Sequence, residues 1–469
     1  AMGNNDVTSA SDGTIAIGDL ALANLVNGAR NVAIGRSAML DSQGAGDNVA
    51  IGHEVLKEGS TSEQNVAVGN YALGANSASA LTGNANVAVG YKSLYVAQGD
   101  SKFNVAVGGE SLTDVTTGIE NVAVGYQSGY NMTDGADVVA IGYKSLFTNT
   151  SAGGIISIGA YAGYNVNNAA AGNSVFIGKD AGFAITEGQY NIMIGSAAGT
   201  EETVGDKMTF VGHRAGYRTG GLGNLDNTFI GWEAGSGDWA SNSSSYNTVV
   251  GSNAFYGNCD GANYNTAVGY KSLLATTSGD ANTMVGYQAG DGITLGGQNT
   301  GIGADVAFDI DADNQTCIGF QATTSAANSV KIGNGSVTNA NIQVDWTIDS
   351  DIRIKKDIED NTLGLSFINS LKPKKYRKLH PADWDKEIRE KRYEKYERDE
   401  FDDVKVWDGL IAQDLKESID KSGTTFSGWS EDANGKQGIQ YSALVVPLIK
   451  AVQELSAKVE DLEKQLKDK

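Results

Sequence analysis

The sequence predicts a mainly β protein in which a long parallel solenoid is followed by a small α+β domain that ends in a helix. Three observations carry this prediction. A phrase of the type Asn-Val-Ala-Ile-Gly recurs along most of the 469 residues. The composition changes near residue 345, and the last 25 residues carry an apolar heptad pattern.

This recurring sequence motif, called the phrase below, ends in a glycine that follows Ile or Val. Ten of the 18 intervals between these glycines are 17 residues long, and none exceeds 21. Because a fixed period of this length is typical of repeat architectures, we interpret residues 1–345 as an array of about 19 coils. The repeat glycines are Gly18, Gly35, Gly52, Gly69, Gly90, Gly108, Gly125, Gly142, Gly159, Gly178, Gly195, Gly212, Gly231, Gly251, Gly269, Gly286, Gly303, Gly319 and Gly333.

One coil is predicted to contain two short strands and two turns. Val32 and Ile34 fall on one face of a strand and Ala33 on the other. An Ala or Ser three residues after the glycine, present in 16 of 18 coils, favours a second, closely packed strand. With one strand spacing per coil, the array would form a rod roughly 90 Å long. So thin a solenoid cannot cover the Ala33 side, so we expect copies of the chain to bury that side.

The repeats resemble those in the head domain of YadA-like trimeric adhesins. The resemblance covers about residues 14–335 and is carried by the phrase, although the coils here are longer than is typical of that family. It implies a left-handed parallel β-roll assembled as a homotrimer, with longer loops. No collagen-binding residues can be transferred from it.

Extra residues in a solenoid coil go into surface loops, where ligands bind. The coil from Gly231 to Gly251 is three residues longer than the 17-residue period. It contains Trp239, Asn242 and Tyr246, which suit stacking on a sugar and hydrogen bonding to it. A structural cap of the roll uses similar residues, so a receptor loop and a cap both fit.

Histidine, cysteine and aromatic side chains of the array are further candidates for ligand contacts. The histidines His53 and His213 lack further metal ligands at a suitable spacing, so no metal site is predicted, and no cofactor motif is present. Cys259 and Cys317 fit small buried side chains. Aromatic residues directly after the repeat glycine fit either packing between coils or chains, or glycan binding, and they form the series His53, Tyr91, Tyr126, Tyr143, His213, Trp232, Tyr270, Tyr287 and Phe320.

Composition divides the chain into residues 1–345 and 346–469. All three prolines follow Ser350, whereas 55 of the 61 glycines precede it. Residues 1–349 carry 12 basic and 31 acidic side chains, and residues 350–469 carry 23 and 25. The acidity of the array argues against nucleic acid as a partner and against anionic membranes. The sequence has no apolar run long enough to predict membrane insertion.

Four motifs in the second segment resemble the intramolecular chaperone domain of phage endosialidases, tailspikes and tail fibres, which is also a self-cleaving protease. They are Ser350–Lys355, Leu363–Pro373, Gly409–Asp414 and Ile439–Leu444. The resemblance covers residues 350–469, and the four motifs stand in the order of the family.

The resemblance implies a Ser-Lys dyad that cuts the Asp349–Ser350 bond. Ser350 would be the nucleophile and Lys355 its base, while Asp351 and Arg353 would hold the turn as an ion pair. A serine hydroxyl needs a neighbouring base, and a lysine serves when burial lowers its pKa. Lys356 is the alternative lysine. No other catalysis is predicted, because the acidic residues of the array lie in polar turns.

Residues 445–469 are predicted to form a coiled-coil helix. The apolar positions Leu448, Val452, Leu455, Val459, Leu462 and Leu466 are spaced by four and three residues in alternation. A lone amphipathic helix would show the same spacing. Beside a repeat array, a parallel trimeric coiled coil that sets the register of three chains is the better interpretation.

Together these features predict a phage tail fibre or spike. Its trimeric rod would bind a host cell-surface glycan or protein receptor, and further tail proteins would attach through a part N-terminal to this sequence. We expect it in the virion, after synthesis in the host cytoplasm. The alternatives are a fragment of a bacterial trimeric adhesin, which would need a membrane anchor of β-strands, and a glycan-degrading tailspike.

Overall fold

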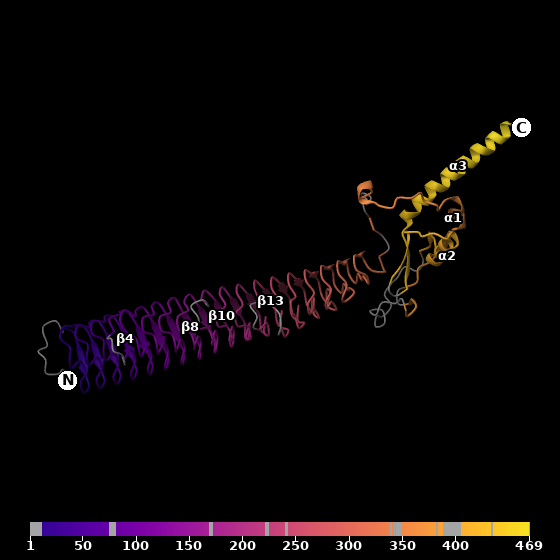
Figure 1. Ribbon diagram of the computed structural model, residues 1–469. Helices are drawn as coiled ribbons and strands as arrows, with labels where there is room; N and C mark the ends of the chain where they lie inside the picture. Colours follow the sequence, from indigo (N-terminus) through magenta and orange to yellow (C-terminus); the bar gives the residue numbers. More distant parts are fainter. Residues whose placement is uncertain are drawn as a thin grey trace. The chain divides into compact units, whose positions relative to one another are not determined.

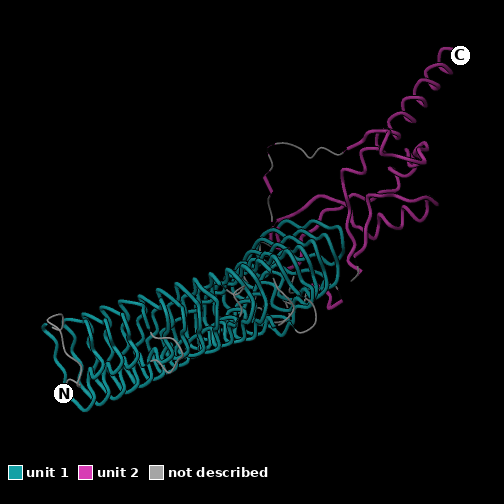
Figure 2. Tube along the Cα trace, turned by 60° about the vertical axis from the view of Figure 1, so that its left-hand side comes forward, with its two compact units in different colours: residues 1–332 teal, residues 333–469 magenta. Residues whose placement is uncertain are grey.

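The computed structural model describes residues 12–74, 81–167, 172–220, 225–239, 243–337, 340–341, 343, 349–380, 383–387, 405–432 and 435–468. The chain divides into two compact units, residues 1–332 and 333–469 (Figure 2). The boundary predicted between residues 345 and 346 lies outside the described residues.

Unit 1 is a parallel β-solenoid in which each three-residue strand pairs with the strand of the next coil (Figure 1). This confirms the mainly β solenoid predicted from the repeats. The strands are β1 (Ile15–Ile17), β2 (Val32–Ile34), β3 (Val49–Ile51), β4 (Val66–Val68), β5 (Val87–Val89), β6 (Val105–Val107), β7 (Val122–Val124), β8 (Val139–Ile141), β9 (Ile156–Ile158), β10 (Val175–Ile177), β11 (Ile192–Ile194), β12 (Thr209–Val211), β13 (Thr228–Ile230), β14 (Thr248–Val250), β15 (Thr266–Val268), β16 (Thr283–Val285), β17 (Thr300–Ile302), β18 (Thr316–Ile318) and β19 (Val330–Ile332).

The strands stack in a constant register. Between β2 and β3, Ala33 lies opposite Ala50. Between β4 and β5 the central residues Ala67 and Ala88 are also opposite each other, although they are 21 residues apart in sequence. The additional residues of a long coil therefore lie outside the strand ladder and do not shift it.

The central residue of every strand from β2 to β18 is buried in the interior of its coil, so the prediction that copies of the chain cover the Ala33 side is wrong. Ala33 is 0% exposed within the single chain, because the turns that follow the glycine fold back over it. The opposite face, formed by the first and third strand residues, points outward. Exposed large apolar side chains on this face are Ile15, Ile17, Ile51, Val124, Ile156, Ile192, Ile230, Val250, Val285, Ile302, Ile318, Val330 and Ile332.

The segment after the repeat glycine forms turns, and the prediction of a second strand there is wrong for the described residues. Ser37 and Met39 both have left-handed backbone angles, with φ of 55° and 54°. This alternation sends the Ser37 N–H to Asp19 O in the preceding coil and the Met39 N–H to Val55 O in the following coil. Coil-to-coil hydrogen bonding thus continues without an extended strand.

The interior is filled by paired large and small residues. Where the strand centre is Ala33, the residue six positions later is the buried Met39. Where the centre is Phe210, that later position is Gly216, and a Cβ there would lie 2.5 Å from Phe210 Cε2. Where the strand centre is Phe or Met instead of Ala, the residue six positions later is therefore a glycine, which leaves room for the larger side chain.

A ladder of buried asparagines runs beside the strands. Asn48 donates from its backbone N–H and from Nδ2 to Asn31 Oδ1, at 3.0 and 3.2 Å. Its Nδ2 also donates to Ser62 O at 2.9 Å. The backbone link to the Oδ1 of the preceding asparagine connects the asparagines from Asn31 to Asn121 and again from Asn227 to Asn299. The asparagine of the phrase thus satisfies buried polar groups between coils.

Unit 2 is a small α+β domain with a C-terminal helix, as predicted. It contains η3 (Ile352–Ile354), α1 (Leu365–Ser370), β20 (Lys374–Tyr376), β21 (Trp407–Gly409), α2 (Ala412–Ser422), β22 (Trp429–Glu431), β23 (Gln437–Ile439), η6 (Tyr441–Leu444) and α3 (Val445–Lys467). Strands β20 and β21 pair antiparallel, as do β22 and β23. The core comprises Leu363, Phe367, Leu415, Ile419 and Leu444.

Helix α3 is tied to α1 near its middle. The backbone N–H of Leu365, the first residue of α1, donates to Glu454 Oε2 at 2.8 Å. Beyond Glu454 the apolar seam of α3 is exposed, at Leu455, Val459, Leu462 and Leu466. Among the residues that the structure describes, no helix has the length and apolar character needed to cross a membrane.

Candidate functional site

The turn at the start of unit 2 brings Ser350 and Lys355 together. Lys355 Nζ lies 2.6 Å from Ser350 Oγ. Between them, η3 shortens the chain through the hydrogen bond from Ile354 N to Asp351 O, at 3.2 Å. Of the two candidate lysines, Lys355 is therefore the one whose ammonium contacts the serine hydroxyl.

Asp351 and Arg353 close the same turn. The Asp351 carboxylate accepts from the Arg353 backbone N–H at 2.8 Å, and Arg353 Nη2 lies 2.6 Å from Asp351 Oδ2. The side-chain hydrogen bond from Arg353, followed by the backbone one, lowers the pKa of the Asp351 carboxyl. The Asp351 carboxylate thus caps the start of η3, the turn that precedes Lys355.

The site can support proton transfer between a hydroxyl and an amine, next to the Asp349–Ser350 peptide bond. In its charged form Lys355 donates to Ser350 Oγ; an uncharged amine at the same distance would accept the hydroxyl proton. Ser350 and Lys355 are both exposed in the single chain. A lysine base needs an environment that disfavours its charge, so a second surface must cover this turn for catalysis.

The long coil predicted to carry a receptor loop is only partly at the surface. Trp239 is 1% exposed and packs edge-on against Phe229 and Phe255, with ring centroids 5.4 and 5.9 Å apart. Of the two alternatives for this coil, the buried indole of Trp239 fits the structural cap and does not fit a ligand contact. Tyr246 is exposed and stacks on Tyr264, and Asn242 lies outside the described residues.

The aromatic residues that follow the repeat glycines stack from coil to coil. Tyr126 and Tyr143 are 5.8 Å apart between ring centroids, and Tyr270 and Tyr287 are 5.5 Å apart. His213 stacks on Trp232 at 6.2 Å. These contacts account for six of the nine members of the series as packing between neighbouring coils, while most of the rings remain partly exposed.

Both cysteines are buried, as expected for small core side chains. Burial raises the pKa of the Cys259 thiol well above its usual range. His53 lies 3.5 Å from the Glu54 carboxylate. Within the described residues no group of three or more His, Cys, Asp or Glu is arranged to hold a metal ion.

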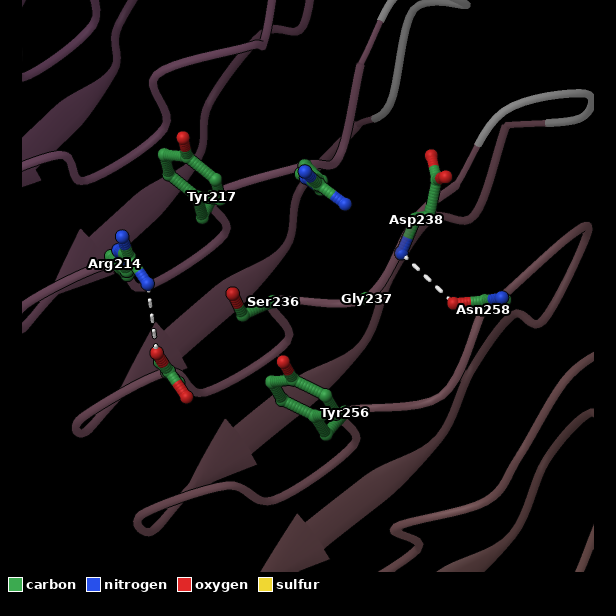
Figure 3. A pocket seen from close by; sticks show the side chains of 9 residues that line it. Arg214, Tyr217, Ser236, Gly237, Asp238, Tyr256 and Asn258 are labelled. Atoms are coloured by element: carbon green, nitrogen blue, oxygen red, sulfur yellow. Dashed lines mark hydrogen bonds and ion pairs between the residues drawn. The ribbon is translucent and has the colours of Figure 1, made fainter.

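A surface pocket on the array was missed by the sequence analysis. It is lined by residues of three successive coils, among them Arg214, Tyr217, Arg218, Asp238, Tyr256 and Asn258 (Figure 3). One signal in the sequence pointed to it. Residues 1–349 contain only four arginines, and two of them stand at 214 and 218, on either side of a Tyr at 217.

Comparison with known protein families finds a match within the second unit. A model of the family described as chaperone of endosialidase matches residues 350–424, and the match begins at Ser350. No curated protein matches the chain. The chain therefore combines a parallel β-solenoid with a segment similar to the endosialidase chaperone, a combination that fits a tail-fibre-like or spike-like protein.

Proposed function

We propose that this protein is the host-surface-binding rod of a phage tail fibre or spike, with a C-terminal chaperone that trimerises the chains, sets their register and then removes itself. The observation that carries the proposal is the chaperone-like match, which starts at the serine contacted by Lys355 and follows the solenoid in sequence. The protein would reside in the virion and bind a glycan or protein on the host.

Two exposed apolar surfaces support a homotrimer. Along the array, the outward strand residues are apolar at both positions from β1 to β11, for example at Ile156 and Ile192, and from β12 to β18 a Thr is paired with a Val or Ile. On α3, Val459 and Leu462 belong to an exposed seam with heptad spacing. Exposed apolar surface favours association, and three parallel copies would bury each of the two surfaces.

The proposed cleavage consumes one water. Ser350 Oγ attacks the carbonyl carbon of Asp349 while Lys355 Nζ takes the hydroxyl proton. The tetrahedral intermediate then breaks its bond to Ser350 N, which receives the proton, and an ester to Oγ remains. Water hydrolyses the ester, which yields a carboxylate on residue 349 and a free amino group on residue 350. Because the registering domain is then gone, the rod would be kinetically trapped.

Alanine at Ser350 is expected to abolish the cleavage, because no nucleophile remains. Full-length bands on a denaturing gel, compared with the fragments of 349 and 120 residues in wild type, measure this. Lys355→Ala should also remove cleavage, whereas Lys356→Ala should leave it intact, since only Lys355 contacts Ser350. Identical band patterns for wild type and Ser350→Ala would end the proposal of self-cleavage.

A charge in the α3 seam is expected to break the trimer. Val459→Asp places a carboxylate among apolar side chains that would face one another in a coiled coil. Light scattering should give three chains for wild type and fewer for the variant. Ala457→Asp adds the same charge on the outer face of the helix and should remain trimeric. If Val459→Asp keeps the wild-type mass, α3 is not the trimerising element.

Loss of the trimer should also slow cleavage at least about tenfold, because the burial that a lysine base requires is then missing. The seam variant Val459→Asp tests this on the same gel. Cleavage at the wild-type rate in a monomer would show that the dyad works without a second chain.

A further inference from the structure

The pocket between Arg214 and Asn258 has the size of a site for one small ligand. Its volume is about 280 Å³, near the lower limit of small-molecule sites, which is about 300 Å³. The residues come from three neighbouring coils, so the solenoid backbone holds them at fixed spacing (Figure 3). A pocket built in this way is present before any ligand arrives.

Two tyrosine rings frame the pocket. Tyr217 lies against the guanidinium groups of Arg214 and Arg218, at 5.0 and 5.8 Å from the ring centroid. These contacts hold the first ring in place. The second ring, Tyr256, is 42% exposed and lies on the next coil but one. An exposed ring at the edge of a polar pocket is suited to stacking on the apolar face of a sugar.

The polar groups of the pocket combine donors and acceptors. Arg214 Nη1 lies 3.4 Å from Glu233 Oε1, and Arg218 Nε lies 3.8 Å from Glu201 Oε1. Both distances exceed that of a normal charged hydrogen bond, so these guanidinium groups retain donor capacity for a ligand.

On the opposite side, Asn258 Oδ1 accepts from the Asp238 backbone N–H at 3.2 Å. This bond fixes the side-chain amide of Asn258, whose Nδ2 can still donate. The carboxylate of Asp238 and the hydroxyl of Ser236 supply acceptors nearby (Figure 3). A ligand with several neighbouring hydroxyl groups, each able to donate and to accept, matches this mixture better than an apolar molecule does.

We propose that this pocket binds one saccharide unit of a host surface polysaccharide. The inference rests on the proposed host-binding function and deepens it. Tyr256 stacks on the sugar ring, Arg218 donates to its oxygen atoms, and Asp238 and Asn258 bind adjacent hydroxyls. The arginines would bind a hydroxyl of a neutral sugar or a carboxylate of an acidic sugar. Neutral and acidic polysaccharides used as probes distinguish these two cases.

The test uses the full chain and an array of purified bacterial lipopolysaccharides and capsular polysaccharides, both neutral and acidic. Wild type is expected to bind at least one of them. Tyr256→Ala and Arg218→Ala should each weaken that binding about tenfold or more. Tyr287→Ala and Arg36→Ala remove the same residue types on other coils and should bind as wild type does. Unchanged thermal unfolding confirms that the pocket variants are folded.

Two results would overturn the inference. If wild type binds a polysaccharide and both pocket variants bind equally well, the pocket is not the site, although the host-binding function stands. If wild type binds none of the polysaccharides but still attaches to cells that display them, the receptor is not a saccharide. Failure to attach to any such cells would instead count against the proposed function itself.

Discussion

Replacement of Gly108 by alanine is expected to destabilise the array by about 3 to 6 kcal/mol. Gly108 has φ of +133°, a conformation that side chains rarely adopt. A Cβ at this position would lie 2.5 Å from the carbonyl oxygen of Gly125 in the next coil. Since that oxygen belongs to the backbone, the contact can be relieved only by separating two coils.

The adjacent Gly109 provides a matched control. A Cβ there would meet only the edge of the Tyr126 ring, at 3.4 Å, which is an ordinary contact. Gly109→Ala should therefore unfold near the wild-type temperature, whereas Gly108→Ala should unfold well below it. Because each coil contacts only its neighbours, the damage should be local, and limited proteolysis should cut the variant between about residues 90 and 142. Equal midpoints for the two variants would refute the stacking argument.

The second large effect is expected in the interior at Phe210 and Gly216. Phe210→Ala leaves a cavity and should cost about 3 to 5 kcal/mol. Gly216→Leu should also destabilise, because its Cβ would lie 2.5 Å from Phe210 Cε2. In the double variant the leucine can occupy the space of the lost ring, as Leu146 does beside Ala140 in a natural coil.

The double variant is thus expected to be more stable than the sum of the two single changes by about 2 kcal/mol. Thermal unfolding of all four proteins, followed by circular dichroism, measures this coupling. A leucine can adopt the left-handed backbone conformation needed at position 216, because Leu146 has φ of 50° at the same place in its coil. If the two single changes in unfolding free energy simply add in the double variant, the side chains at positions 210 and 216 do not fill the same part of the core.

The sequence was sufficient to predict the solenoid, because the period and the strand phrase are local signals. It could not say which strand face is internal. Val32, Ala33 and Ile34 are all apolar, so alternation does not distinguish the two faces, and the turn that covers Ala33 has an unusual left-handed backbone at Ser37 and Met39. Such angles in non-glycine residues are not readable from residue type.

The sequence also predicted part of the candidate sites, namely the contact between Ser350 and Lys355, but not the surface pocket. Ser350 and Lys355 are near in sequence, so a turn suffices to join them, and the motif named both. The sequence leaves Trp239 open between a receptor loop and a structural cap, because whether a loop residue points inward depends on packing against Phe229 and Phe255. The pocket escaped notice because its residues are spread over three coils, a proximity that only the stacking creates.

The constant register of the strands separates the physical length of the array from its length in residues. A coil of 21 residues, between Gly69 and Gly90, advances the stack by the same single strand spacing as a coil of 17. The axial dimension is therefore quantised in steps of about 4.8 Å. Gain or loss of a whole coil by gene duplication or deletion would change the length of the array by one step, while changes within a loop would alter only its flank.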